Sequence, residues 1–108
     1  MKKEINASPL AHRLLRELGE NIRFARLRRK LSIQTVANRA GIAINTVVAI
    51  EKGATGVSIG AIINTLHCLG LAADISLIAK DDVLGRKLQD LQLALKKRAP
   101  KIKKTNMI

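Results

Sequence analysis

Residues 31–53 read LSIQTVANRAGIAINTVVAIEKG, and this stretch decides the fold of the chain. Ser32 is a helix N-cap residue, because its hydroxyl oxygen can accept a hydrogen bond from a free N–H of the first turn. Gly41 tolerates a positive φ and therefore allows a sharp turn. The stretch predicts two short helices, over residues 33–40 and 44–52, that are separated by this turn.

Apolar residues lie where the two short helices have to cross. Val36 and Ala37 are the inward positions of the first helix, and Val47 and Ile50 are those of the second. Ala37 is small enough to let the two helices approach closely. The second helix then turns its remaining residues outward, and an exposed helix of this width fits the DNA major groove. The outward residues are Ile44, Asn45, Thr46, Val48 and Ala49.

Helices are also predicted on both sides of this stretch. Ser8 and Pro9 form an N-cap and a first helical position, so a helix is expected over residues 10–30, with a possible bend at Gly19. Ser58 precedes another apolar periodic segment, residues 59–69. The residues expected at inward or periodic positions are Leu14, Leu15, Leu18, Ile22, Ala25, Ile59, Ile62, Ile63, Leu66 and Leu69.

The C-terminal part is expected to contain a strand and a helix. Residues 73–79 are short, apolar and partly alternating, which predicts a strand whose unpaired edge could pair with the same strand of a second subunit. Residues 84–98 predict an amphipathic helix with a heptad-like stripe, which can be a dimer seam, a surface for a partner, or part of the chain's own core. The stripe consists of Leu84, Leu88, Leu91 and Leu95.

These elements predict a mainly α fold with four parts. Residues 1–9 are expected to be an N-terminal arm, and residues 10–71 a helical DNA-binding domain. Residues 72–99 would hold the short strand and the added C-terminal helix, and residues 100–108 a basic tail. A chain of 108 residues is long enough for one compact domain with an accessory element.

The net charge points to a polyanionic partner. The chain carries 20 Lys and Arg residues against 8 acidic ones, a formal charge of +12. Nucleic acid is the first candidate and an anionic membrane surface the second. Phe24 is the only aromatic residue, which excludes modules that stack bases on exposed rings. The basic C-terminal end also lacks interfacial aromatics, so we expect no membrane partner.

No pattern in the sequence indicates an enzyme, a cofactor or a metal site. No nucleophile with a positioned base is visible, and residues 53–56 lack the lysine and serine of a phosphate-binding loop. His67 and Cys68 are adjacent on a helix, so their side chains point in different directions. The lone cysteine, the absence of a signal-like N-terminus and the absence of a long apolar run predict a cytoplasmic protein.

The central stretch resembles the helix-turn-helix of the XRE, or lambda-repressor-like, family of transcriptional regulators. The match covers about residues 18–71, and the matching positions are Ser32, Val36, Ala37, Gly41, Thr46, Val47, Ile50, Glu51 and Gly53. The resemblance implies a lambda-repressor-like helical bundle. It also implies a structural ion pair between Arg26 of the first helix and Glu51 at the end of the third.

The same resemblance implies that the helix beginning near Ala43 approaches base edges. The chain departs here from the usual glutamine or arginine, because Ile44, Val48 and Ala49 offer only apolar contacts, for example to thymine methyl groups. Asn45 is the one amide that can bond adenine, and the expected base contacts are completed by Thr46. The expected phosphate contacts are Arg28, Arg29, Lys30, Ser32, Ile33, Gln34, Arg39, Lys52 and Thr55.

A narrower resemblance concerns residues 66–80, LHCLGLAADISLIAK, which are similar to the C-terminal part of HipB-type antitoxins. It implies a homodimer that represses its own operon by binding the upstream DNA, and a HipA-like kinase toxin as partner. The expected dimer or partner contacts are Ile75, Leu77, Leu84, Leu88, Leu91 and Leu95. Three alternatives remain open: an XRE regulator without a toxin, a non-specific nucleic-acid-binding protein, and a protein-interaction module.

Overall fold

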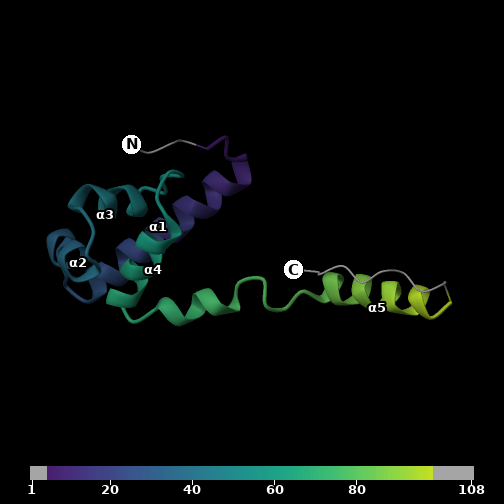
Figure 1. Cartoon of the computed structure of the whole chain (residues 1–108). Helices are drawn as coiled ribbons and strands as arrows, with labels where there is room; N and C mark the ends of the chain where they lie inside the picture. Colours follow the sequence, from purple (N-terminus) through teal and green to yellow (C-terminus); the bar gives the residue numbers. More distant parts are fainter. Residues whose placement is uncertain (1–4, 99–108) are drawn as a thin grey trace. The chain divides into compact units, whose positions relative to one another are not determined.

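The chain is mainly helical in the computed structural model, which describes residues 5–98 (Figure 1). This confirms the expected mainly α class. The described elements are α1 (Pro9–Arg28), α2 (Ile33–Ala40), α3 (Ile44–Glu51), α4 (Ile59–Cys68), the 3-10 helix η1 (Ala72–Leu77) and α5 (Val83–Arg98). The chain divides into two compact units, the first ending at Ile75 and the second beginning at Ser76.

Serine side chains start three of the helices of the first unit. The Oγ atoms of Ser8, Ser32 and Ser58 accept hydrogen bonds from the backbone N–H groups three residues further on, at 3.1, 3.0 and 3.1 Å. These bonds satisfy N–H groups that have no partner inside the helix. Local side-chain chemistry therefore determines where α1, α2 and α4 begin.

The four helices of the first unit pack around two apolar clusters. One cluster joins α1, α3 and α4 and consists of Ile22, Ala25, Ile50, Ile62, Leu66 and Leu69. The other joins α2 to α3 and consists of Val36, Ala37 and Val47, each at most 1% exposed. Since α3 contributes to both clusters, its inward face is fixed by contacts on two sides.

Gly19 has a packing role, and α1 continues through it from Pro9 to Arg28 as one helix. Gly19 is buried, and a Cβ atom at this position would lie 2.7 Å from the carbonyl oxygen of Glu51 and still closer to that of Ile50. A contact this short is not possible for a real side chain. Glycine is therefore what lets α1 approach the C-terminal end of α3.

Two residues expected in the inward pattern are exposed instead. Ile59 is 65% exposed and Leu14 is 50% exposed. Ile59 is the first residue of α4, and Leu14 lies in the N-terminal half of α1. Both follow the helical period, but no described element covers them at these positions, so periodicity alone overestimated the core.

The strand expected over residues 73–79 is wrong for this structure, because the segment forms η1 followed by a turn. A strand needs a neighbouring strand for its backbone hydrogen bonds, and residues 5–98 contain no strand with which this segment could pair. Backbone bonds between residues close in the sequence replace that neighbour, as in the 3.2 Å bond from the Lys80 N–H to the Leu77 carbonyl. Ile75 packs half-buried against the first apolar cluster, whereas Leu77 is 60% exposed.

The second unit contains α5, whose start is capped as its sequence suggests. The Asp82 carboxylate accepts a hydrogen bond from the Gly85 N–H at 2.9 Å, and Asp81 pairs with Arg86 at 2.7 Å on the surface. The four leucines of the stripe, Leu84, Leu88, Leu91 and Leu95, are each more than half exposed. The apolar stripe of α5 is therefore a solvent-facing surface in this structure.

Candidate nucleic-acid interface

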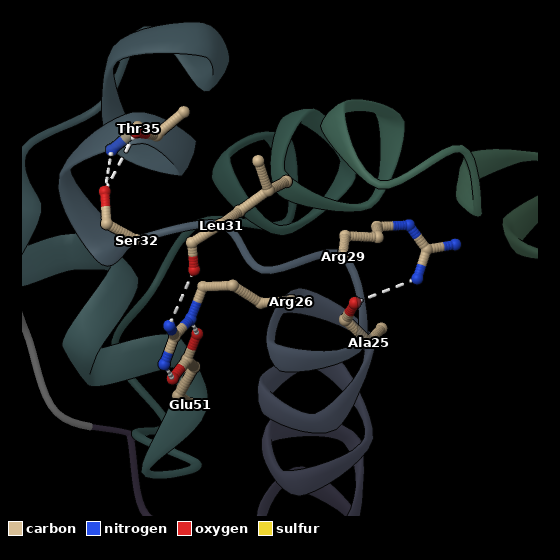
Figure 2. A network of polar contacts seen from close by, with 7 residues as sticks. All are labelled: Ala25, Arg26, Arg29, Leu31, Ser32, Thr35 and Glu51. Carbon is tan, nitrogen blue, oxygen red and sulfur yellow. Dashed lines mark hydrogen bonds and ion pairs between the residues drawn. The ribbon is translucent and has the colours of Figure 1, made fainter.

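A buried ion pair holds the end of α3 against α1 (Figure 2). Arg26 donates from Nε to Glu51 Oε2 at 2.7 Å and from Nη2 to Glu51 Oε1 at 3.0 Å, which makes the contact bidentate. The two side chains are only 9% and 6% exposed. The hydrogen bond to Glu51 raises the pKa of Arg26, against the opposing effect of burial. The bidentate geometry restricts how the end of α3 can lie against α1.

Arg26 also fixes the connection between α1 and α2. Its Nη1 donates to the Leu31 carbonyl oxygen at 3.0 Å, so one guanidinium binds the end of α3 and the backbone immediately before α2 (Figure 2). The ion pair that the XRE resemblance implied is thus present in the geometry. The bond to Leu31 was not anticipated, because nothing in the sequence identifies which carbonyl a third donor will reach.

The turn after α1 carries a cation where α2, α3 and α4 are each followed by glycine. At this turn the N–H of Lys30 bonds the Leu27 carbonyl and the N–H of Leu31 bonds the Arg26 carbonyl, at 3.0 and 3.2 Å. This pair of bonds is the Schellman motif, which needs a left-handed residue. That residue is glycine after α2, α3 and α4, namely Gly41, Gly53 and Gly70. After α1 it is Lys30, with φ 53°.

Free backbone donors lie directly after this turn, at the start of α2. Ser32 Oγ accepts from the Thr35 N–H and lies 2.9 Å from Thr35 Oγ1, so that N–H is already satisfied (Figure 2). The N–H groups of Ile33 and Gln34 have no hydrogen-bond partner among the described residues. The Gln34 side chain is exposed beside them. Free N–H groups at a helix start are suited to a phosphate oxygen.

The remaining cations expected at phosphates lie on the surface of the first unit. Arg28, Arg29 and Lys30 are exposed at the end of α1. The Arg29 Nη1 donates to the Ala25 carbonyl at 2.9 Å, which holds its guanidinium close to α1 (Figure 2). Arg39 near the end of α2 and Lys52 after α3 are exposed as well. The exposed cations thus lie on, or directly after, α1, α2 and α3.

The outward face of α3 is largely apolar. At 100° per residue, Ile44, Asn45, Val48 and Ala49 share one side of the helix, opposite Val47 and Ile50. Ile44 is 47% exposed and Asn45 is exposed, whereas Val48 and Ala49 are half-buried. Thr46 is half-buried and lies at the edge of the buried side. No charged residue interrupts this face between Ile44 and Ala49.

No protein-family model matches this chain. A comparison of its sequence with curated proteins also finds no match. The geometry of the first unit is therefore the main basis for assigning a function.

One polar contact in this region was missed by sequence reasoning. Asn64 of α4 donates from Nδ2 to the Ala40 carbonyl at 3.2 Å, next to the turn at Gly41. This bond holds the last turn of α2. Because asparagine is unfavourable inside a helix, the position of Asn64 in the middle of α4 is the sequence signal that its amide has a specific partner.

The remaining expected site residues belong to the loop after α3 or to the second unit. Thr55 is half-buried in the loop after α3, and Leu84 to Leu95 belong to the second unit. Within residues 5–98 no group of three or more His, Cys, Asp or Glu side chains could hold a metal ion. No described helix is both long and apolar enough to cross a membrane. The candidate site therefore consists of the outward face of α3, the free N–H groups at the start of α2, and exposed cations on or directly after α1, α2 and α3.

Proposed function

We propose that this chain is a sequence-specific DNA-binding repressor in which α2 and α3 form a helix-turn-helix of the lambda-repressor type. In this proposal α3 enters the major groove, and the start of α2 with the end of α1 contacts phosphates. The observation that carries it is the exposed face of α3, which the Arg26–Glu51 pair fixes and which exposed Lys52 follows directly, in a unit whose α1–α2 turn and α2 also carry exposed cations.

Exposed cations, free N–H groups and an uneven charge distribution in the first unit together support contact with DNA. The exposed Arg28 and Lys30 supply positive charge at the α1–α2 turn, and the free N–H groups of Ile33 and Gln34 follow within one helical turn. The charge is not spread evenly, because Glu17 and Glu20 lie in the middle of α1. A phosphate backbone along the α1–α2 turn would meet cations and avoid these carboxylates.

The proposed type of repressor follows from the resemblance of residues 66–80 to HipB-type antitoxins. We propose a homodimer that binds the DNA upstream of its own gene, with paired copies of α3 in half-sites about one helical turn apart. A HipA-like kinase toxin is the proposed protein partner, which makes the chain a HipB-like antitoxin of a type II toxin–antitoxin system. The exposed leucines of α5 are the surface that such a protein contact would use.

The experiment compares two exposed arginines of the same helix. Arg28→Gln removes a proposed phosphate contact, and Arg13→Gln removes the same charge about 22 Å away along α1. Binding to a duplex from the upstream DNA is measured by fluorescence anisotropy over a range of salt. Arg28→Gln should weaken binding and reduce the slope of log K against log salt by about 0.9, the value for one phosphate.

Arg13→Gln should leave both the affinity and the slope close to those of the unaltered protein. If the two variants weaken binding equally, the charge acts without a defined contact surface, and the proposed orientation of α1 and α2 on DNA is wrong. This second outcome favours a non-specific nucleic-acid-binding protein, the alternative that the charge of +12 supports.

A further inference from the structure

The exposed side of α3 has an unusual chemical composition for a surface that contacts DNA. Of the four residues on this side, Ile44, Val48 and Ala49 carry no hydrogen-bonding atom in the side chain, and only Asn45 carries an amide. Ile44 is 47% exposed, and Val48 and Ala49 are half-buried beside it. Most of the information that this side can read must therefore come from apolar contact.

The major groove offers one apolar group that distinguishes base pairs. Thymine presents its C5-methyl group there, and 5-methylcytosine presents the same group at the same ring position. The other groove edges carry amino, keto or ring-nitrogen groups, which lose hydrogen bonds to water when an isoleucine or valine covers them. An apolar helix face therefore favours methylated pyrimidines and disfavours unmethylated cytosine at the positions it covers.

The charge around α3 argues that a nucleic acid, and not an apolar protein groove, covers this side. Lys52 follows α3 directly, Arg39 lies near the end of α2, and Lys30 lies in the turn before α2. All three are exposed, and the only acidic residue of α3, Glu51, is committed to Arg26. At 100° per residue, Lys52 falls on the same side as Ile44 and Val48, so the apolar side of α3 ends in a cation and is complementary to a polyanion.

We propose that the outward side of α3 recognises the C5-methyl groups of pyrimidines, with Ile44 and Val48 as the contacting residues and Asn45 reading a neighbouring adenine. This inference rests on the proposed function, since it names what the same helix reads in the groove. It makes Ile44 and Val48 residues that determine sequence specificity.

The test removes the methyl group from the DNA without changing its hydrogen-bonding groups. The probe is the DNA upstream of the protein's own gene, prepared with thymidine or with deoxyuridine in its place, and a scrambled duplex is prepared in both forms. Deoxyuridine should weaken specific binding about fourfold for each methyl contacted, and about fifteenfold when one is contacted in each of two half-sites. A third form of the probe, with 5-methylcytosine for cytosine, distinguishes the two sources of the methyl group.

Two isoleucines provide matched variants, because each is the first residue of its helix. Ile44→Ala removes the proposed contact on α3, and Ile59→Ala shortens the exposed isoleucine that begins α4. The affinity ratio between thymidine and deoxyuridine probes should fall toward one in Ile44→Ala and stay unchanged in Ile59→Ala. Val48→Ala is a second variant of the same side, and circular dichroism checks that each variant is folded.

Each outcome has a definite meaning. A methyl effect that Ile44→Ala or Val48→Ala abolishes supports the proposal; unchanged binding to the 5-methylcytosine probe then assigns the recognised group to thymine, and tighter binding extends it to methylated cytosine. Specific binding that ignores deoxyuridine, or an equal methyl effect in all variants, overturns this inference and leaves the proposed function intact. Equal binding to the upstream and scrambled thymidine duplexes overturns the proposed function as well.

Discussion

Replacing Glu51 by glutamine tests how much the fold depends on the ion pair behind α3. Arg26 and Glu51 are 9% and 6% exposed, so Glu51→Gln leaves a buried guanidinium without its counter-charge. Breaking a buried pair in this way costs about 3–5 kcal/mol, and the amide oxygen that remains places the expected loss near about 3 kcal/mol. A folded unit of this size has a free energy of unfolding of about 4–10 kcal/mol. The variant should therefore lose a large part of its stability.

The assay is thermal and urea unfolding followed by circular dichroism at 222 nm. A loss of about 3 kcal/mol lowers Tm by about 12–24 °C in a domain of this size. Glu20→Gln is the matched control, because it makes the same substitution at an exposed position of α1 that has no ion pair among the described residues. This control should change the free energy of unfolding by less than about 0.5 kcal/mol.

A double variant separates the charge from the packing. Arg26→Met with Glu51→Leu replaces both partners by apolar side chains of similar volume, and such replacements of buried pairs are often neutral or stabilising. We expect it to recover most of the stability that Glu51→Gln loses. If Glu51→Gln and Glu20→Gln shift Tm by similar small amounts, the argument that this pair holds α1, α2 and α3 together is refuted.

Three further predictions concern other positions of the first unit. Gly19→Ala should destabilise the protein by about 1–3 kcal/mol in urea unfolding, because the new Cβ would collide with the α3 carbonyls. The control Gly60→Ala, where the nearest atom lies 4.0 Å from the added Cβ, should be neutral or stabilising. Equal effects of the two substitutions would contradict the close α1–α3 crossing. Lys30→Gly should raise stability by up to about 1 kcal/mol, because φ 53° costs a lysine more than a glycine, while weakening DNA binding; a variant that binds DNA normally would remove Lys30 from the interface. The hydrogen bond to Glu51 raises the pKa of Arg26, so the stabilisation from this guanidinium is complete at every pH below the ordinary range of arginine and is lost only at still higher pH. Urea unfolding midpoints should therefore show no pH dependence that comes from Arg26 near neutral pH, and a pH dependence that Arg26→Met abolishes would contradict this.

The starts and ends of the helices were predictable because they depend on local chemistry. Ser32 caps α2 and Gly41 ends it with φ 69°, and each residue needs only its neighbours along the chain to do so. The outward side of α3 followed in the same way from the positions of Val47 and Ile50. The Arg26–Glu51 pair came from the family resemblance, since spacing alone does not identify partners that are 25 residues apart.

The features that were missed depend on contacts between distant parts of the chain. Gly19 suggested a bend, but its role is to admit the α3 carbonyls, which are more than 30 residues away in the sequence. Ile59 fits the helical period and is exposed because nothing described covers it. Residues 73–79 have the composition of a strand, yet a strand forms only beside another strand, so η1 forms here instead.

The most direct test of the account is the ratio of affinities for the upstream DNA and for a scrambled duplex of the same composition, measured by fluorescence anisotropy at increasing salt. Specific recognition by α3 predicts a preference of at least about a thousandfold that persists as salt weakens both complexes. Equal affinities that fall together and steeply with salt would mean that binding is counterion release by a chain of charge +12, and would contradict the proposal.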